Sequence, residues 1–341
     1  MTKTYNDVLA VVSQSGPTVT FFDAVTYDRL GEAVVPHEPH ELHFDAARRR
    51  LYCTVTYRSG YYHANSGRAR ELVVLDPDER RVTDVVDLAP EWAPHGIALD
   101  PSGELLWVSV EGASDGEDGA LVALDAESLR PVRRVDVGAP GPHWFTLTPD
   151  GTRAYTANKE APFVSVVDVG SGALVDRIGV PGSEGIAVSR DGSQVYVAAP
   201  KGDFGGGPVR DAGVRVVDTA TGTVVRTLPT EGVVFPVHVT STGLLLAGEL
   251  RMTAGGSALG GQEPGVLHVY DGDFRERARL DVGAFPLTIT SSPDGRYGYV
   301  AAVSSSTVTV VDLEAGAAVA TLEVGRSGEP GAHGLAYVPS A

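Results

Sequence analysis

The sequence is poor in several features that would each indicate a particular class of protein. It has 341 residues but only one cysteine, Cys53, so no disulfide can form within the chain. No apolar run approaches the roughly 18 residues that a membrane-spanning helix requires. The opening residues, MTKTYNDVLAVV, lack the basic, apolar and cleavage regions of a signal peptide. A reducing, cytoplasmic location without a membrane partner is therefore expected.

Basic residues are also scarce. Lysine and arginine together number 27, against 44 aspartates and glutamates, and the formal net charge is -17. The densest basic cluster is Arg48, Arg49 and Arg50, which is too small to offset that charge. Because nucleic acids and anionic membranes are repelled by such a surface, nucleic acid is not expected as a partner.

What the chain does have is a repeat. Short apolar runs that end in aspartate recur along the whole sequence, and each is followed by a turn of small polar residues and another β-branched run. An aspartate suits that place because its side chain caps the backbone of the turn. The seven aspartates are Asp23, Asp76, Asp125, Asp168, Asp218, Asp271 and Asp312.

A second marker precedes most of these runs and consists of a strand, a tight turn ending in glycine and another strand, as in FPLTITSSPDGRYGYVAA. Each unit therefore contains four short strands without helical periodicity, over the roughly 40 to 55 residues of a β-propeller blade. We predict that residues 1–341 form a single all-β domain, a seven-bladed β-propeller of four-stranded blades. The turn glycines are Gly103, Gly151, Gly192 and Gly295.

The two ends of the sequence indicate how the ring closes. Three strands are expected near the N-terminus, at residues 8–12, 18–23 and 29–35, but only one near the C-terminus, at 334–338. These four strands must share a blade, which leaves no free sheet edge. A pair of open β-sandwiches is the alternative, but it does not explain seven equivalent registers.

The repeats SPDGRYGYVAA, TPDGTRAYTAN and SRDGSQVYVAA resemble the YVTN-type β-propeller repeat family. That family includes lactonase-like and surface-layer-like propellers and, more distantly, propellers of the virginiamycin B lyase type. The resemblance spans the whole chain and implies the propeller fold. It implies no single activity, because proteins with such folds range from scaffolds to lyases and hydrolases.

In a propeller the innermost strand of each blade lines the central channel, so one register of these strands faces a common axis. At the position eight residues before the turn glycine or its equivalent, four of the seven blades have histidine, although the chain has only 9 histidines. Allowing for roughly 45 registers per repeat, the chance of this is about 1 in 1,000. The register consists of His40, His95, His143, Glu184, Phe235, Leu287 and His333.

The four histidines of this register fall on consecutive blades. Neutral imidazoles bind transition metals without adding carboxylate or thiolate charge, which favours iron or copper, with zinc or nickel also suitable, over calcium or magnesium. We therefore predict one transition metal ion bound by His40, His95, His143 and His333.

Metal-bound histidines normally donate their second ring nitrogen to a carboxylate or carbonyl. Glu91 and Glu329 each lie four residues before a site histidine, while Glu38 and Glu41 flank His40, so all four are candidates. In a chain this acidic, however, a loop glutamate is more often simply a solvated surface charge.

The remaining members of the register suggest a substrate pocket. Glu184 fits either of two roles, a fifth ligand or a general base whose pKa is set by burial and by the metal; a solvated channel carboxylate is the plainer alternative. Phe235 and Leu287 make the opposite wall apolar, which is typical of a pocket for a small organic molecule. His43 and His238 lie three positions beyond the register and should point to the opposite strand face.

Three connections between second and third strands are long, namely residues 58–70, 200–213 and 249–265. Long loops on a rigid scaffold often carry specificity, and they lie on the face where the site is expected. His63, in the first of them, is a candidate catalytic base. An ordinary surface loop is the alternative interpretation of each.

The leading hypothesis is a metal-dependent enzyme acting on a small organic molecule at the propeller axis, as a mononuclear iron or copper oxidoreductase. In geometry alone, a four-histidine centre on a propeller axis resembles the carotenoid-cleaving oxygenases, whose repeats are of a different type. A metal-assisted, lactonase-like lyase or hydrolase with Glu184 or His63 as base is the first alternative. A non-catalytic metal-binding or interaction propeller is the second.

Overall fold

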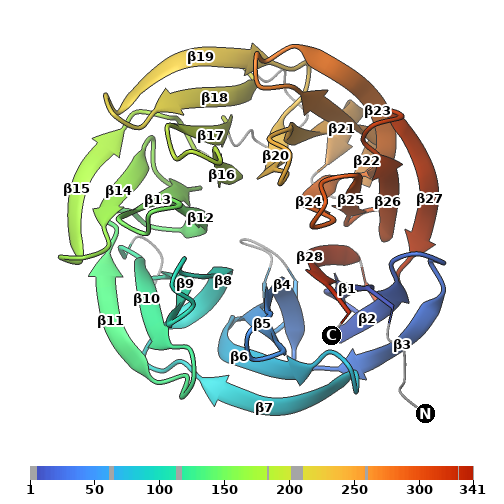
Figure 1. Ribbon diagram of the computed structural model, residues 1–341, viewed down its shortest axis with the longest axis horizontal. Helices are drawn as coiled ribbons and strands as arrows, with labels where there is room; N and C mark the ends of the chain where they lie inside the picture. The colour runs from blue at the N-terminus through green and yellow to red at the C-terminus, as the bar shows by residue number, and fades with distance from the viewer. Residues whose placement is uncertain are drawn as a thin grey trace.

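The computed structural model describes residues 6–60, 65–112, 117–182, 184–200, 210–257, 260–328 and 330–340. The strands form seven four-stranded sheets arranged as a ring around a central axis (Figure 1). This arrangement confirms the predicted seven-bladed β-propeller. Within the described ranges, no helix has the length and apolar character needed to cross a membrane.

Each blade is a meander whose first strand lies nearest the axis (Figure 1). Blade 1 consists of β4 (Glu38–Asp45), β5 (Arg50–Tyr57), β6 (Arg68–Asp76) and β7 (Arg81–Asp87). Blade 2 consists of β8 (Trp92–Leu99), β9 (Leu105–Glu111), β10 (Ala120–Asp125) and β11 (Pro131–Asp136). Blade 3 consists of β12 (Pro142–Leu147), β13 (Arg153–Asn158), β14 (Val164–Asp168) and β15 (Ala173–Ile178).

The remaining blades continue around the ring. Blade 4 consists of β16 (Ile186–Val188), β17 (Gln194–Ala199), β18 (Gly213–Asp218) and β19 (Thr223–Pro229). Blade 5 consists of β20 (Val234–Val239), β21 (Leu245–Ser257), β22 (Gly260–Tyr270) and β23 (Glu276–Ala284). Blade 6 consists of β24 (Pro286–Ser291), β25 (Tyr297–Ala302), β26 (Thr307–Asp312) and β27 (Ala317–Glu323). Blade 7 joins β28 (Ala332–Val338) to β1 (Val8–Ser13), β2 (Thr18–Asp23) and β3 (Arg29–Val34).

Blade 7 closes the ring in the predicted way. The C-terminal strand β28 pairs antiparallel with β1, with Val8 opposite Val338 and Leu9 opposite Tyr337. Because β28 takes the innermost place in this sheet, the last strand of the chain lines the axis. The first and last strands of the described chain are thus paired with each other within one blade.

The repeated aspartates cap the turns between the third and fourth strands. Oδ1 of Asp168, for example, accepts a hydrogen bond from the backbone N–H of Ser171 at 2.8 Å. All seven aspartates accept comparable bonds from the backbone of their turns. The glycines of the other repeated turn have φ of +68° to +74°, a conformation that favours glycine because it lacks Cβ.

The connection at residues 249–265 differs from the expected loop. Here β21 and β22 extend into a long hairpin, in which Arg251 pairs with Glu263 and Met252 with Gln262. The length of this connection predicts a loop, but the strands pair again, after an irregularity beyond Met252, at Ser257 opposite Gly260. The other two long connections include residues 61–64 and 201–209, which lie outside the described residues, and so does His63.

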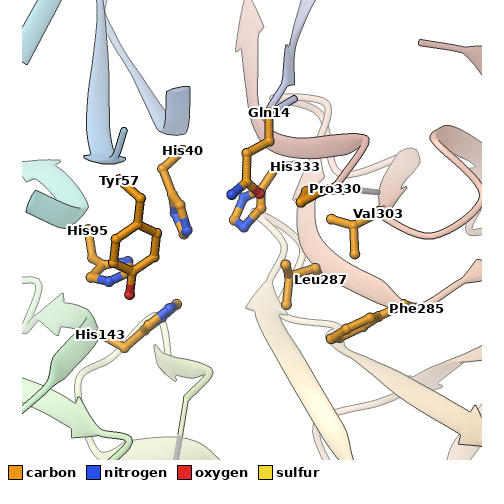
Figure 2. A pocket seen from close by; sticks show the side chains of 10 residues that line it. All are labelled: Gln14, His40, Tyr57, His95, His143, Phe285, Leu287, Val303, Pro330 and His333. Carbon is orange, nitrogen blue, oxygen red and sulfur yellow. The ribbon is translucent and has the colours of Figure 1, made fainter. Parts of the chain in front are cut away.

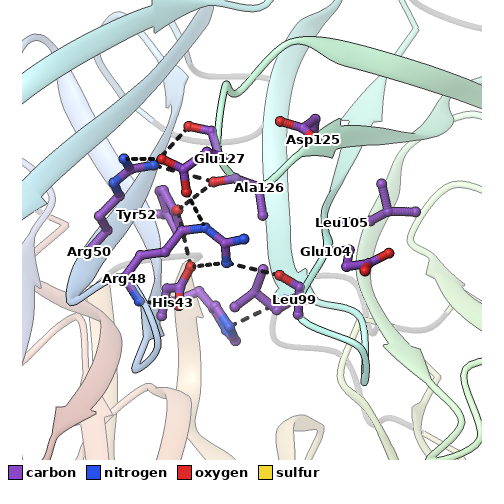
Figure 3. Close-up of polar contacts among 12 residues, drawn as sticks. His43, Arg48, Arg50, Tyr52, Leu99, Glu104, Leu105, Asp125, Ala126 and Glu127 are labelled. Carbon is purple, nitrogen blue, oxygen red and sulfur yellow. Dashed lines mark hydrogen bonds and ion pairs between the residues drawn. The ribbon is translucent and has the colours of Figure 1, made fainter.

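The basic cluster is paired with carboxylates where blade 1 meets blade 2 (Figure 3). Arg48 lies 3.0 Å from Asp45 and 3.0 Å from Glu127. His43, predicted to point away from the axis, accepts a hydrogen bond from the backbone N–H of Leu99 on the neighbouring blade at 3.2 Å. Arg49 pairs with Asp78, and Arg50 with Glu127.

We predict that Asp168→Asn makes the free energy of unfolding depend less on pH in the acidic range. Hydrogen bonds from Ser171 lower the pKa of Asp168 in the native protein. A carboxylate of this kind stabilises the fold above its unfolded pKa of about 4, and the contribution is lost as the pH falls through the lower native value. Asparagine keeps the acceptor but does not titrate. Urea unfolding between about pH 4 and pH 2 should therefore give a shallower loss of stability.

An unchanged slope in this variant would contradict the capping role. Asp168→Ala serves as the comparison, because it removes both the acceptor and the charge. It should be less stable than Asp168→Asn at neutral pH as well.

Candidate metal centre

Four histidine rings lie side by side at the axis (Figure 2). They belong to the innermost strands of consecutive blades, with His333 on β28, His40 on β4, His95 on β8 and His143 on β12. The ring centroids are separated by 4.0 Å between His333 and His40, 4.6 Å between His40 and His95, and 4.1 Å between His95 and His143. Each residue is at most 5% exposed. The shared register thus places four imidazoles in one buried cluster.

Hydroxyl groups on the second strands hold the backbone of these histidines. Thr54 Oγ1 accepts a hydrogen bond from the backbone N–H of Glu41 at 3.1 Å and donates one to the carbonyl of His95 at 2.8 Å. Ser109 repeats the arrangement one blade further on, between the N–H of Gly96 and the carbonyl of His143. Each hydroxyl therefore fixes one site histidine relative to the next.

Glycine follows two of the histidines because the strands approach closely there. A Cβ on Gly334 would lie 2.3 Å from the carbonyl oxygen of His40, and a Cβ on Gly96 would lie 3.1 Å from that of His143. A side chain at Gly334 would push the innermost strands apart. The His-Gly pairs in the sequence are thus a condition for bringing the rings together.

The imidazole nitrogens are the main unsatisfied polar atoms of this region. Nδ1 of all four histidines is buried without a hydrogen-bond partner in the described part of the chain, and so is Oε1 of Glu41. Buried polar atoms without partners are rare in folded proteins, so a cluster of five calls for an explanation. Ligand atoms of His40, His95 and His143 lie within 4.8 Å of one another, and those of His40, Glu41 and His333 do so as well.

The protonation state of the rings suits metal binding. Burial lowers the pKa of His95 to about 4, with a further lowering by the charge of Lys159. Burial also holds the pKa of His40 and His143 well below the usual value. These three rings are therefore neutral at pH 7, which is the form that donates a lone pair to a metal.

Glu41 lies beside two of the histidines and offers a carboxylate oxygen next to their ligand nitrogens. Its Oε1 lies 3.3 Å from Nδ1 of His333 and 3.5 Å from Nδ1 of His40. Burial raises the pKa of Glu41, but His333 and His40 outweigh burial and lower the value to about 2. Of the four glutamates suggested as partners of the site histidines, Glu41 lies beside two of the rings, but at the nitrogen atoms that would bind an ion and not at the second ring nitrogens. Glu91 instead pairs with Arg134 at 2.8 Å, and Glu329 lies outside the described residues.

A second carboxylate, Glu111, orients His95 and was not anticipated. Its Oε1 lies 2.9 Å from Nε2 of His95 and accepts a hydrogen bond from the hydroxyl of Tyr57 at 3.2 Å. Oε1 also accepts a hydrogen bond from the buried ammonium of Lys159, which donates another to Tyr57 at 3.2 Å. Burial disfavours both charges, but the pairing raises the pKa of Lys159 and lowers that of Glu111.

A second register in the sequence could have revealed this network. The residues eight positions after the turns at Arg49, Gly103, Gly151 and Gly295 are Tyr57, Glu111, Lys159 and Val303. They end the second strands, or directly follow them, next to the first residues of the innermost strands. Chemically distinct residues occupy this register, so counting one residue type did not expose it.

The remaining residues of the first register lie apart from the histidines. Glu184 is 1% exposed and precedes β16, and its charge helps to raise the pKa of Lys159. Leu287 lines the cavity next to the histidines, whereas Phe235 packs behind it against Phe285, with ring centroids 4.9 Å apart. Phe235 and Leu287 belong to one apolar cluster.

We predict that Lys159→Met destabilises the protein by about 3–5 kcal/mol, because it leaves the buried carboxylate of Glu111 without its ammonium partner. Urea unfolding at pH 7 measures the change. Adding Glu111→Gln should recover much of the loss, since the uncompensated charge is then removed.

The matched control for this prediction is Arg275→Met. It breaks an ion pair with Asp273 in which both side chains are more than two-thirds exposed. Exposed pairs contribute about 0–1 kcal/mol. Equal effects of the two substitutions would contradict the network at Glu111.

Comparison with known proteins places the chain among propellers. No protein-family model matches it. It is 26% identical over 227 residues to the uncharacterized protein YncE of Salmonella typhi and of Salmonella typhimurium, an alignment that covers 62% of this chain and 57% of the relative. The match thus spans little more than half the length of these curated relatives.

Two solved structures share the fold. Hydrazine synthase of Kuenenia stuttgartiensis superposes with a TM-score of 0.68 at 20% identity, over 88% of this chain and 90% of that one. Dihydro-heme d1 dehydrogenase NirN, in complex with DHE, gives a TM-score of 0.63 at 15% identity, over 96% of this chain and 74% of that one. These two likenesses extend to the propeller fold, while the finer resemblance to YVTN-type repeats stays an expectation.

Proposed function

We propose that the protein is a metal-dependent enzyme in which His40, His95, His143 and His333 bind one transition metal ion, iron or copper in preference to zinc or nickel. The observation that carries this proposal is the cluster of four buried Nδ1 atoms without hydrogen-bond partners among the described residues. Leaving such atoms unsatisfied costs free energy, and coordination to a metal removes that cost.

The charges around the histidines favour a cation at the centre. Glu41 and Glu111 are buried beside the rings, and Glu184 is buried near Lys159. Lys159 is the buried counter-charge, and Arg68, 22% exposed, lies 3.3 Å from the second oxygen of Glu111. The carboxylates thus outnumber the fully buried cations, and a divalent ion restores the balance.

Oxidation or reduction of a small molecule is the reaction class we propose. Iron or copper bound by neutral imidazoles would supply one-electron chemistry. The names of the two structural neighbours, a hydrazine synthase and a dehydrogenase, support redox chemistry on this scaffold, although their likeness to this chain extends to the fold alone. The chain's own residues would hold the ion, orient the ring of His95 through Glu111 and exclude bulk water, with Glu41 next to the ligand nitrogens of His40 and His333.

The lyase or hydrolase alternative has less support. It requires a base next to the bound substrate, but Glu184 is not among the described residues that line the cavity. Its negative charge instead interacts with Lys159. Electron transfer at a metal does not by itself require a base, and His63, the other candidate base, lies outside the described residues.

Metal analysis tests the proposal. After reconstitution with copper or iron, we expect about one ion per chain, and His95→Ala should lose it. Electron paramagnetic resonance of the copper(II) form should show hyperfine coupling to several nitrogen atoms. His238→Ala is the control, because His238 lies on the innermost strand β20 outside the register and hydrogen-bonds Ser291 at 2.9 Å. Stoichiometric metal that His95→Ala retains would overturn the proposal.

We further expect Glu111→Gln to weaken metal binding by about 10–100-fold, because outer carboxylates fix the orientation and basicity of a ligating histidine. A competition titration with a chelator measures the affinity. Glu91→Gln is the control, since Glu91 pairs with Arg134 rather than with a histidine. Equal affinities in the two variants would show that Glu111 does not act on the centre.

A further inference from the structure

The cavity beside the histidines has two chemically different walls (Figure 2). His40, His95, His143 and Tyr57 lie on one side, and Phe285, Leu287, Val303 and Pro330 lie on the other, with Gln14 and His333 between them. Its free volume is about 30 Å³. A single water needs roughly 10–15 Å³ of such space, so the space between the two walls has room for about two or three non-hydrogen atoms.

The apolar wall is rigidly supported. Phe285 and Val303 are 2% and 3% exposed, and both belong with Leu287 to the apolar cluster around Phe235. Phe285 has a positive φ of 60° and packs against Phe235, which fixes its ring. A wall packed in this way does not readily retreat to admit a larger molecule.

Apart from the four histidines, the polar side chains that line the cavity already have partners. The amide nitrogen of Gln14 donates a hydrogen bond to the carbonyl of Gly60 at 3.2 Å. The hydroxyl of Tyr57 is bound by Glu111 and Lys159. No lysine, arginine, aspartate or glutamate is among the described lining residues. An ionic substrate would therefore lose its hydration without gaining a counter-charge from the walls.

We propose that the molecule bound beside the centre is uncharged, weakly polar and very small, with two or three non-hydrogen atoms, as in a diatomic gas or a one- or two-carbon alcohol, aldehyde or thiol. This inference rests on the proposed metal function. It adds that Leu287 and Val303 limit the size of the bound molecule. It also adds that the described lining, which contains no ionic side chain, disfavours a charged one.

Ligands of graded size test the proposal on the copper(I)-loaded protein. Carbon monoxide and methyl isocyanide should bind, whereas tert-butyl isocyanide should bind at least about tenfold more weakly than methyl isocyanide, the discrimination expected when a few surplus methyl groups meet a rigid wall. Leu287→Ala shortens a side chain of the apolar wall and so enlarges the cavity. It should recover at least half of the lost affinity for tert-butyl isocyanide, on a logarithmic scale. Val303→Ala is the second enlarging variant, should Leu287→Ala fail to fold.

Leu322→Ala is the matched control. Leu322 belongs to the same blade as Leu287 and is similarly buried, at 5% against 6%, but it lies on the fourth strand, away from the axis. It should leave the ratio of the two isocyanide affinities unchanged. The copper(II) form should bind azide, an anion of similar size to methyl isocyanide, only weakly.

The outcomes separate this inference from the proposed function. If the protein binds copper but has equal affinity for both isocyanides, the size limit is wrong. If it prefers azide to the neutral ligands, the preference against charge is wrong. In both cases the proposed metal centre is unaffected. Failure to bind copper or iron at all overturns both.

Discussion

The close approach of the innermost strands around the axis is the constraint on which the rest of the structure depends. At Gly334 the neighbouring backbone is so near that a Cβ would meet the carbonyl oxygen of His40 at 2.3 Å. Thr54 and Ser109 then bind the carbonyl groups of His95 and His143 from the preceding blades. Because these contacts fix the backbone rather than the side chains, they place whatever residue occupies the register. Four histidines there become a cluster without any specialised loop, on a scaffold that is rigid before a ligand arrives.

Two kinds of polar group are buried in and around this cluster: nitrogen atoms without hydrogen-bond partners, and charged groups that are paired with one another. The four Nδ1 atoms lack partners in the described structure, whereas Glu111, Lys159 and Tyr57 bind one another. A fully connected buried network stiffens its surroundings, because each group that moves leaves another unpaired. The network of Glu111, Lys159 and Tyr57 therefore holds the ring of His95 in place, while the Nδ1 atoms of the histidines stay available. The apolar residues on the far side contribute neither charge nor donors, and so they restrict what can lie next to the histidines.

Much of this could be predicted from the sequence, for a definite reason. Each blade repeats the same turn chemistry, so aspartates such as Asp168 and glycines such as Gly103 mark where strands end. The number of strands, the fold and the closure of the ring could be predicted from these positions. The shared register of the histidines followed from the same spacing. The network at Glu111 did not, because Tyr57, Glu111 and Lys159 have no chemistry in common and are related only by position. The hairpin at 249–265 was also missed, since a connection of this length suggests a loop, whereas β21 and β22 extend into it with an irregular register.

The place of β28 in blade 7 gives the site a further property. His333 lies on the last strand of the chain, which becomes part of the ring only by pairing with β1 near the N-terminus. His40, its nearest neighbour at 4.0 Å between ring centroids, lies on the first strand of the next blade. An ion shared by these two rings would join blade 7 to blade 1 across the seam where the chain ends meet. Its binding free energy would then oppose the opening of the ring at that seam, so that an ion bound there would also stabilise the closed propeller.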